Sequence, residues 1–211
     1  WTMHFGSPYG NHPTARRYNA TRTFGTFPFP AGLTPADTAH QRTEPIEGGA
    51  LIPAGLPSDF KPHKPAARTQ QAQAATQPIA IRDATIAIAQ AAQRLDALRR
   101  NWLNPPEWTR TVPEVVPLGM AHSPYPDRIE PKPGLSEADA KALQKRTLTN
   151  LYNQRPAWLA QAHEALDTAV AAAYGWADYT PAMPDDEILR RLLALNRERA
   201  VQAGAAKKAA S

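Results

Sequence analysis

Cysteine is absent from this chain of 211 residues. Its absence excludes disulfide bonds, thiolate nucleophiles and zinc sites built on cysteine. The sequence also lacks an apolar run long enough to span a membrane, and it lacks a secretory signal pattern. We therefore expect a protein of a reducing compartment, the cytoplasm, with no membrane partner.

Large apolar side chains are scarce as well. The sequence contains 5 Phe, 5 Trp and 6 Tyr beside 22 Pro and 11 Gly. Alanine, which buries little area per residue, supplies much of the 42% hydrophobic fraction. This composition predicts a modest helical core with long irregular connections.

Metal-binding patterns are missing too. The six histidines include no pair at the spacing of metal ligands and have no cysteine beside them. The acidic run 185–187 is explained more simply by a helix start, where the helix dipole favours negative charge. We therefore expect no metal site and no metal partner.

The strongest helical pattern lies in residues 81–102. Seven side chains recur there at alternating spacings of three and four, which places them on one face of a helix: Ile81, Ala84, Ile88, Ala91, Leu95, Leu98 and Trp102. Pro105 and Pro106 stop this helix. A capping-box pattern at Ser136 opens a second helix, which extends to about Leu151.

Two further helices follow. Pro156 opens the third helix, which Gly175 closes as a left-handed cap, and Asp185 caps the fourth. Prolines are frequent in the segments 37–77 and 104–134, where no period persists. The predicted fold class is mainly α: a small bundle of about four helices, with long Pro-rich irregular connections and a short β or extended segment at the N-terminus.

The first 36 residues contain arginines but no acidic residue, since the first acid is Asp37. Arginine and the polar and aromatic residues near it can bond phosphate oxygens or read base edges. The candidate DNA-binding residues are Arg16, Arg17, Tyr18, Asn19 and Arg22. A net charge of +5 permits a nucleic-acid partner without requiring one. A solvated basic loop is the alternative interpretation.

The run Asn104-Pro-Pro-Glu107 resembles the Asn/Asp-Pro-Pro-aromatic loop of amino-methyltransferases, whose aromatic residue stacks on a flipped base. Here Glu107 takes the aromatic position, and Trp108 comes one residue late. The run also ends a predicted helix, and no glycine-rich turn that could bind S-adenosylmethionine precedes it. We interpret it as a helix stop, and we expect no catalytic and no cofactor-binding residue in the chain.

The last third of the chain carries three motifs: Arg146-Thr-Leu-Thr-Asn-Leu-Tyr-Asn-Gln-Arg-Pro-Ala-Trp-Leu159, Ala172-Ala-Tyr-Gly-Trp176 and Asp185-Asp-Glu-Ile-Leu-Arg-Arg-Leu-Leu-Ala-Leu-Asn196. With Phe24-Gly-Thr-Phe-Pro-Phe-Pro30 near the start, they resemble the C-terminal end of the large, single-chain, class I DNA adenine-N6 methyltransferases. Those enzymes are related to Type II restriction–modification enzymes. The resemblance covers residues 16–36 and about 79–200.

This resemblance implies a parent enzyme that binds S-adenosylmethionine, flips an adenine and methylates its N6. The chain would supply four successive parts: the end of a target-recognition domain (1–36), a Pro/Gln/Ala-rich linker (37–77), a C-terminal helical domain (78–202) and a frayed tail (203–211). The catalytic residues would lie upstream of Trp1, so we expect a fragment that is inactive alone and has no cofactor of its own. Its expected partners are double-stranded DNA and the upstream catalytic methyltransferase domain.

A helical protein–protein interaction module is the alternative function. The stripe over residues 81–102 also has the spacing of a coiled-coil seam, which would seek a partner helix. Such a module would have neither catalytic nor DNA-binding activity.

Overall fold

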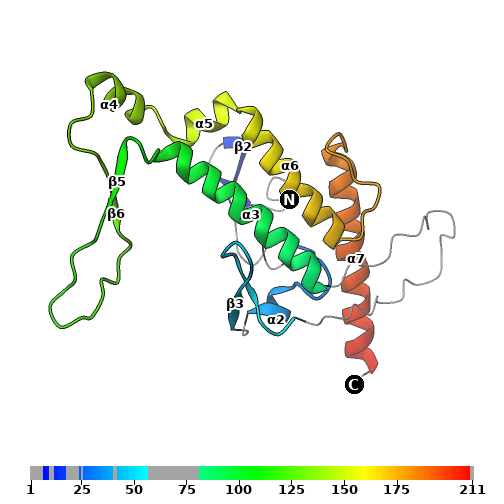
Figure 1. The fold of residues 1–211 in the computed structure, drawn as a ribbon. Helices are drawn as coiled ribbons and strands as arrows, with labels where there is room; N and C mark the ends of the chain where they lie inside the picture. The colour runs from blue at the N-terminus through cyan, green and yellow to red at the C-terminus, as the bar shows by residue number, and fades with distance from the viewer. Residues whose placement is uncertain are drawn as a thin grey trace. The chain divides into compact units, whose positions relative to one another are not determined.

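The computed structural model describes residues 7–9, 12–17, 24, 26–39, 42–56 and 81–209, and at 7–9, 12–17, 203 and 206–209 it describes the backbone alone. This part of the chain is mainly helical, as the sequence predicts (Figure 1). Its helices are α2 (Pro35–Thr38), α3 (Ile81–Leu103), α4 (Glu137–Gln144), α5 (Leu148–Gln154), α6 (Ala157–Ala173) and α7 (Asp185–Ala209). Its strands pair as three two-stranded sheets: β1 (Ser7–Tyr9) with β2 (His12–Arg17), β3 (Thr43–Pro45) with β4 (Leu51–Pro53), and β5 (Thr109–Val112) with β6 (Arg128–Pro131).

The chain divides into two compact units. The first unit comprises residues 1–44, 52–85 and 170–211, and the second comprises residues 45–51 and 86–169. The domain boundaries expected from the sequence, at residues 36, 77 and 202, stay a prediction.

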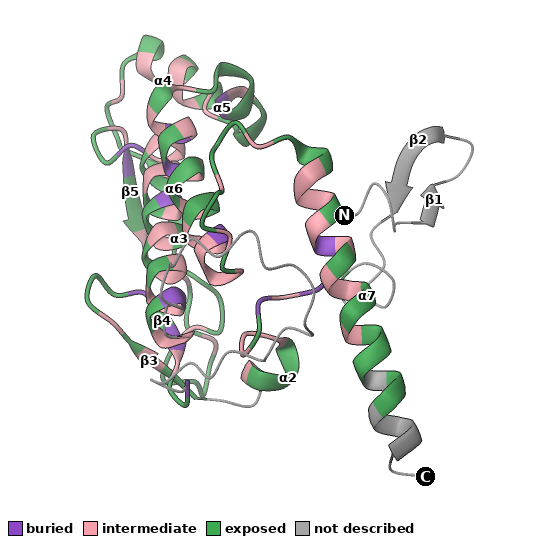
Figure 2. Cartoon of the chain, turned by 90° about the vertical axis from the view of Figure 1, so that its right-hand side faces the viewer, coloured by how far each residue is buried: buried purple, intermediate pink, exposed green. Residues whose placement is uncertain are grey.

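Three helices build the apolar core of the second unit. Leu95 of α3 packs in one cluster with Leu151 of α5 and with Leu159 and Ala162 of α6. Leu151 and Leu159 are almost completely inaccessible to solvent. Partly buried side chains surround this cluster: Leu98, Trp102, Trp158 and Leu166. In Figure 2, buried and half-buried residues run along α3 and α6 beside exposed ones, as expected for amphipathic helices.

The second predicted helix is two helices in the structure. α4 ends at Gln144, and α5 begins at Leu148 after its N-cap, Thr147. The Thr147 side chain accepts a hydrogen bond from the N–H of Asn150 (3.2 Å), and its backbone is extended (φ −110°, ψ 156°). An extended residue cannot continue the helical hydrogen bonds, so the prediction of a single helix here is wrong.

The capping signals predicted at Ser136 and Gly175 are confirmed, whereas Asp185 is the first residue of α7 and not its N-cap. The Ser136 side chain accepts a hydrogen bond from the N–H of Asp139 (3.1 Å) at the start of α4. Gly175 follows α6 with a φ of +74°, the left-handed conformation that favours glycine. Arg155 also has a positive φ, 42°, and ends α5 directly before Pro156. Proline disfavours helical geometry in the residue before it, which separates α5 from α6.

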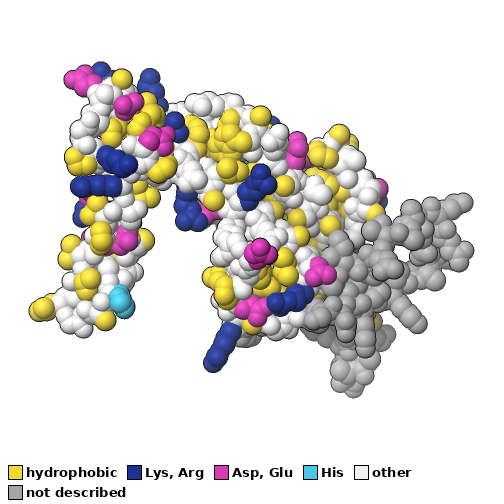
Figure 3. All heavy atoms as spheres, in the orientation of Figure 1, with side chains coloured by type: hydrophobic (Ala, Val, Ile, Leu, Met, Phe, Trp, Pro, Cys, Tyr) yellow, Lys and Arg dark blue, Asp and Glu magenta, His cyan; other side chains and the backbone are white. Residues whose placement is uncertain are grey.

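The Pro-rich stretch 104–134 is predicted to be irregular, and this prediction is wrong where β5 and β6 pair. Their antiparallel register places Arg110 opposite Glu130. The sequence of β5, Thr-Arg-Thr-Val, is rich in β-branched residues, which favour strands. Figure 1 shows β5, β6 and the loop between them leaving the end of α3, and we call residues 109–131 the arm. Figure 3 shows apolar side chains at its far end.

Residues 43–53 belong to the predicted Pro-rich linker, yet they form the hairpin of β3 and β4. Gly48 and Gly49 allow its turn, because both have a positive φ (+88° and +84°) that glycine adopts without strain. Ile52 of β4 is fully buried. The structure therefore differs from the expectation of a loosely packed linker in this stretch.

In the first unit, two hydrogen bonds join the N-terminal Thr-Phe-Pro-Phe-Pro run to the C-terminal third of the chain. Tyr174 donates its hydroxyl hydrogen to the carbonyl of Pro28 (3.0 Å). Asn196 of α7 donates its side-chain amide to the carbonyl of Thr26 (2.9 Å). Pro28 is itself buried, so the run is part of the packed structure.

Leu151→Ala should lower the free energy of unfolding by about 2–5 kcal/mol, because it leaves a cavity in the core of the second unit. Leu148→Ala is the matched control, since Leu148 lies on the same helix but is 50% exposed. The control should change the stability by less than about 1 kcal/mol. Urea unfolding followed by circular dichroism measures both, and equal losses would argue against this core.

Candidate functional site

Two of the candidate DNA-binding residues lie in the described chain. Arg16 and Arg17 are the last two residues of β2, and their backbone pairs with that of β1. The two adjacent arginines therefore lie at the end of one strand of a two-stranded ribbon. Three candidates lie outside the described residues: Tyr18, Asn19 and Arg22.

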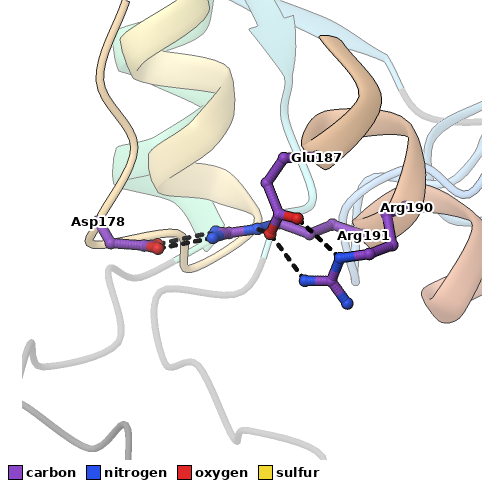
Figure 4. A network of polar contacts seen from close by, with 4 residues as sticks. All are labelled: Asp178, Glu187, Arg190 and Arg191. Atoms are coloured by element: carbon purple, nitrogen blue, oxygen red, sulfur yellow. Dashed lines mark hydrogen bonds and ion pairs between the residues drawn. The ribbon is translucent and has the colours of Figure 1, made fainter. Parts of the chain in front are cut away.

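A charge cluster in the first unit surrounds Arg191, near the start of α7 (Figure 4). The guanidinium of Arg191 donates two hydrogen bonds to the carboxylate of Asp178 (2.7 and 2.6 Å) and one to Glu187 (2.7 Å). Glu187 accepts two more from Arg190 (2.7 Å each). The Arg191 guanidinium also lies 5.4 Å from the ring centre of Trp176, a cation–π distance. The cluster ties the first turns of α7 to the turn that follows α6.

These hydrogen bonds favour the charged form of both carboxylates. The bond from Arg191 lowers the pKa of Asp178 to about 2, and the bonds from Arg190 and Arg191 lower the pKa of Glu187 to about 2. A general acid or base works best with a pKa near the operating pH. The cluster is therefore suited to holding the chain in place and unsuited to proton transfer.

Tyr174 has a structural hydroxyl group. Burial raises the pKa of Tyr174 to about 12, so the hydroxyl stays protonated and keeps its hydrogen bond to Pro28. Its ring stacks on that of Trp176, with the centroids 4.9 Å apart. The stacked rings flank the left-handed Gly175, directly after the end of α6.

A second polar cluster links α3, α5 and α6, the three core helices of the second unit, at the surface. The Tyr152 hydroxyl of α5 lies 3.1 Å from Nε2 of His163 on α6 and 3.4 Å from Nη1 of Arg99 on α3. Asp96 lies 3.6 Å from Arg99. The hydrogen bond with Tyr152 raises the pKa of Arg99. These contacts are exposed, so water competes for each polar group.

The third cluster centres on Arg146, in the connection between α4 and α5. Its guanidinium carbon lies 5.2 Å from the ring centre of Trp102 and 4.7 Å from that of Trp108. It also donates a hydrogen bond to the Trp102 carbonyl (2.8 Å). Arg146 therefore joins the end of α3, the start of the arm and the α4–α5 connection.

The helix stop predicted at Asn104-Pro-Pro-Glu107 is confirmed, since α3 ends at Leu103. The carbonyl of the buried Pro105 accepts hydrogen bonds from the N–H groups of Trp108 and Thr109 (2.9 Å each) and from the Thr109 hydroxyl (2.9 Å). These bonds close a turn that carries the chain from α3 into β5. The run is used structurally.

Within the described ranges, no three His, Asp or Glu side chains are placed to hold a metal ion. None of the helices described is both long and apolar enough to cross a bilayer. The stripe of α3 that suggested a coiled-coil seam ends in Leu95, Leu98 and Trp102, which pack in the core of the second unit. A partner helix along the whole stripe would have to displace that core.

No protein-family model, curated protein sequence or solved structure matches the chain. Membership of the methyltransferase family therefore stays a prediction from the sequence motifs.

The three polar clusters were not predicted from the sequence. One signal was available, because Glu187 precedes Arg190 and Arg191 by the three- and four-residue spacings of helix ion pairs. Asp178 gives no such signal, since it lies outside the helix and 13 residues from Arg191. The contact of Arg146 with Trp102 spans 44 residues and depends on tertiary packing.

Lowering the pH should weaken the Arg191 cluster. The pKa values of Asp178 and Glu187, both about 2, lie below the ordinary 3.8 and 4.5. Their stabilisation is therefore fully present above the ordinary values and is lost as the pH falls toward 2. An NMR titration of the side-chain carboxyl carbons should place both midpoints near 2.

The variant Arg191→Gln should affect the pKa values of the two carboxylates differently in the same titration. The pKa of Asp178 should return toward 3.8, whereas Glu187 keeps Arg190 and should stay lowered. Arg190→Gln is the control, and it should raise the pKa of Glu187 alone. An Asp178 midpoint that does not move in Arg191→Gln would contradict the cluster.

Arg146→Lys should destabilise the second unit by about 1–2 kcal/mol, since lysine keeps the charge but lacks the planar guanidinium that faces two indole rings. Arg155→Lys is the matched control at an exposed position and should change the stability by no more than about 0.5 kcal/mol. Urea unfolding followed by tryptophan fluorescence measures both. A loss no larger than that of the control would show that the rings do not hold Arg146.

Proposed function

We propose that this chain is the C-terminal DNA-recognition and architectural part of a site-specific DNA adenine-N6 methyltransferase of the restriction–modification or phage-defence type. In this proposal the catalytic domain lies elsewhere in the parent enzyme, which acts in the cytoplasm and takes S-adenosylmethionine as its methyl donor. This part binds double-stranded DNA and braces the catalytic domain, and it transfers no methyl group by itself.

The main support for the proposal is a contact between two of the segments that resemble the DNA adenine-N6 methyltransferases. Residues 24–30 and 172–196 are far apart in the sequence and resemble the same C-terminal end of one enzyme family. In the first unit, Pro28 accepts a hydrogen bond from Tyr174, and Thr26 accepts one from Asn196. Segments from neighbouring parts of one enzyme's C-terminal end are expected to contact each other in this way, which supports a common origin for both.

The N-terminal ribbon supports the DNA part of the proposal. A two-stranded β-ribbon is one of the elements that the major groove of B-DNA admits. Arg16 and Arg17 lie at consecutive positions on β2, in a stretch of 36 residues that contains no acid to oppose a phosphate. Arginine binds phosphate oxygens and the major-groove edge of guanine.

The helical part would act as the brace. The core that α3, α5 and α6 share in the second unit gives it rigidity. We propose that the small bundle of about four helices predicted from the sequence presents this rigid surface to the catalytic domain. A rigid support is what a site-specific enzyme needs if it is to hold a flipped base in register with its methyl donor.

The isolated chain should bind duplex DNA weakly, with an affinity that falls steeply as the salt concentration rises. Fluorescence anisotropy with a labelled duplex measures the slope of log K against log salt concentration. Replacing Arg16 and Arg17 together by Ala should reduce the steepness of that slope by about 2, roughly one unit for each lost phosphate contact.

Arg94→Ala combined with Lys141→Ala is the control, because both residues are exposed and the pair removes the same charge from the helices of the second unit. Its slope should stay close to that of the unchanged chain. Binding that ignores salt, or equal slopes for the two double variants, would count against DNA contact by the ribbon. Binding of S-adenosylmethionine by the chain alone would contradict the proposal that the methyl donor binds to a separate catalytic domain.

A further inference from the structure

The arm carries an unpaired strand edge. β5 and β6 form a sheet of two strands, so within the described chain one edge of β6 has no neighbouring strand. Just beyond the strands, the Lys132 N–H donates to the Trp108 carbonyl (2.8 Å). Because bonded and non-bonded pairs alternate in an antiparallel ladder, Arg110 and Glu130 form a bonded pair and Ile129 does not bond to β5. The N–H and C=O groups of Ile129 therefore point to the open edge.

The side chains around Ile129 are arranged so that this edge complements itself. Arg128 precedes Ile129 and Glu130 follows it, and all three remain partly exposed. A second copy that pairs antiparallel with the same edge, about a two-fold axis at Ile129, places Arg128 opposite the partner's Glu130. The axis repeats the arrangement, so the partner's Arg128 lies opposite Glu130. Opposite charges at such cross-strand positions stabilise a sheet, and like charges destabilise it.

The backbone fits the same register. The two Ile129 residues exchange a pair of hydrogen bonds at the axis, and Asp127 lies opposite the partner's Pro131. Proline has no N–H, but its carbonyl accepts the bond from the N–H of Asp127. The Ile129 side chains meet on the face opposite the charges. Each is 50% exposed in the single chain, so the pairing also removes apolar surface from water.

We propose that the arm is a self-association surface, in which the β6 edges of two copies pair antiparallel about Ile129 into a four-stranded sheet. A two-stranded hairpin is only marginally stable in water, and a sheet of four strands is more stable. The association is independent of DNA binding, which the proposed function assigns to the N-terminal ribbon.

Charge favours a second copy over DNA as the partner of the arm. Arg110 and Arg128 lie 3.5 and 3.3 Å from Glu130, and Arg128 also lies 3.1 Å from Glu114. The far end of the arm, residues 115–126, contains no Lys, Arg, Asp or Glu. It offers exposed apolar side chains instead: Val115, Val116, Leu118, Met120 and Tyr125. A phosphate backbone finds no available cation in these contacts.

The edge of β5 does not offer the same match. Alternation directs the backbone groups of Thr111 to that edge, and a two-fold axis there would place Arg110 opposite the partner's Val112. The next outward position is Pro113, which has no N–H to donate. The β6 edge is therefore the one that pairs.

Sedimentation velocity of the full chain at increasing concentration tests the proposal, with three variants. Arg128→Glu and Glu130→Arg each place like charges opposite each other, and each should weaken the dimer by about tenfold or more. An equal mixture of these two variants restores both opposite-charge pairs, so it should dimerise as the unchanged chain does. The double variant with both substitutions keeps the complementarity in reverse and should also dimerise.

The double variant and the mixture distinguish lost pairing from lost folding, because both retain the substituted side chains. An unchanged chain that stays monomeric up to ~1 mM would overturn the proposal and would leave the apolar end of the arm to a different partner. The proposal also fails if the single variants dimerise as strongly as the unchanged chain, or if the mixture stays monomeric while the unchanged chain dimerises.

A second measurement does not depend on charge. The chain contains no cysteine, so Ile129→Cys carries a nitroxide spin label at one position only. Two labels at the two-fold axis should broaden each other's electron paramagnetic resonance spectrum. An excess of unlabelled chain should remove the broadening, because it separates the labels. A spectrum without broadening at concentrations where the chain sediments as a dimer would place the interface elsewhere.

Discussion

The guanidinium of Arg146 lies over the rings of Trp102 and Trp108 and donates a hydrogen bond to the Trp102 carbonyl near the end of α3. Three parts of the second unit depend on this contact: the last turn of α3, the first residues of the arm, and the connection between α4 and α5. An arginine suits this position because its flat, weakly hydrated cation can face aromatic rings and donate a hydrogen bond at the same time. The apolar core beside it packs α3, α5 and α6 together, and Arg146 adds a contact with Trp108, the residue before the arm.

Much of the helical structure is predictable because its signals are local. The stripe of α3, the cap at Ser136 and the left-handed Gly175 each follow from a few neighbouring residues. The break at Thr147 was not predictable in this way. Residues 145–147 are compatible with a helix, and the break accompanies tertiary contacts that no local pattern records, namely the burial of Leu151 and the ring contacts of Arg146.

The strands of the arm are short and separated by a long Pro-rich loop, so their pairing cannot be predicted from local periodicity. At the candidate DNA site, composition identified the basic segment, and the pairing of β1 with β2 places two of its arginines on a ribbon.

The β1–β2 ribbon and the arm differ in chemistry, and this difference is the basis for giving them different roles. The segment that contains β1 and β2 has arginines and no acids. The arm carries charges of both signs that pair with one another, and its far end is apolar and uncharged. A basic ribbon suits a phosphate backbone, whereas a self-complementary edge suits a second copy of the same chain. In these two proposals, two copies joined through their arms would carry two basic ribbons.

One measurement tests the division between the ribbons most directly: an NMR titration of the labelled chain with a DNA duplex, which follows the backbone amide signals of both. The account predicts that DNA shifts the amide signals of residues 12–17 and leaves those of the arm at 109–131 in place. Shifts confined to the arm, or no shift in either ribbon at low salt, would contradict it.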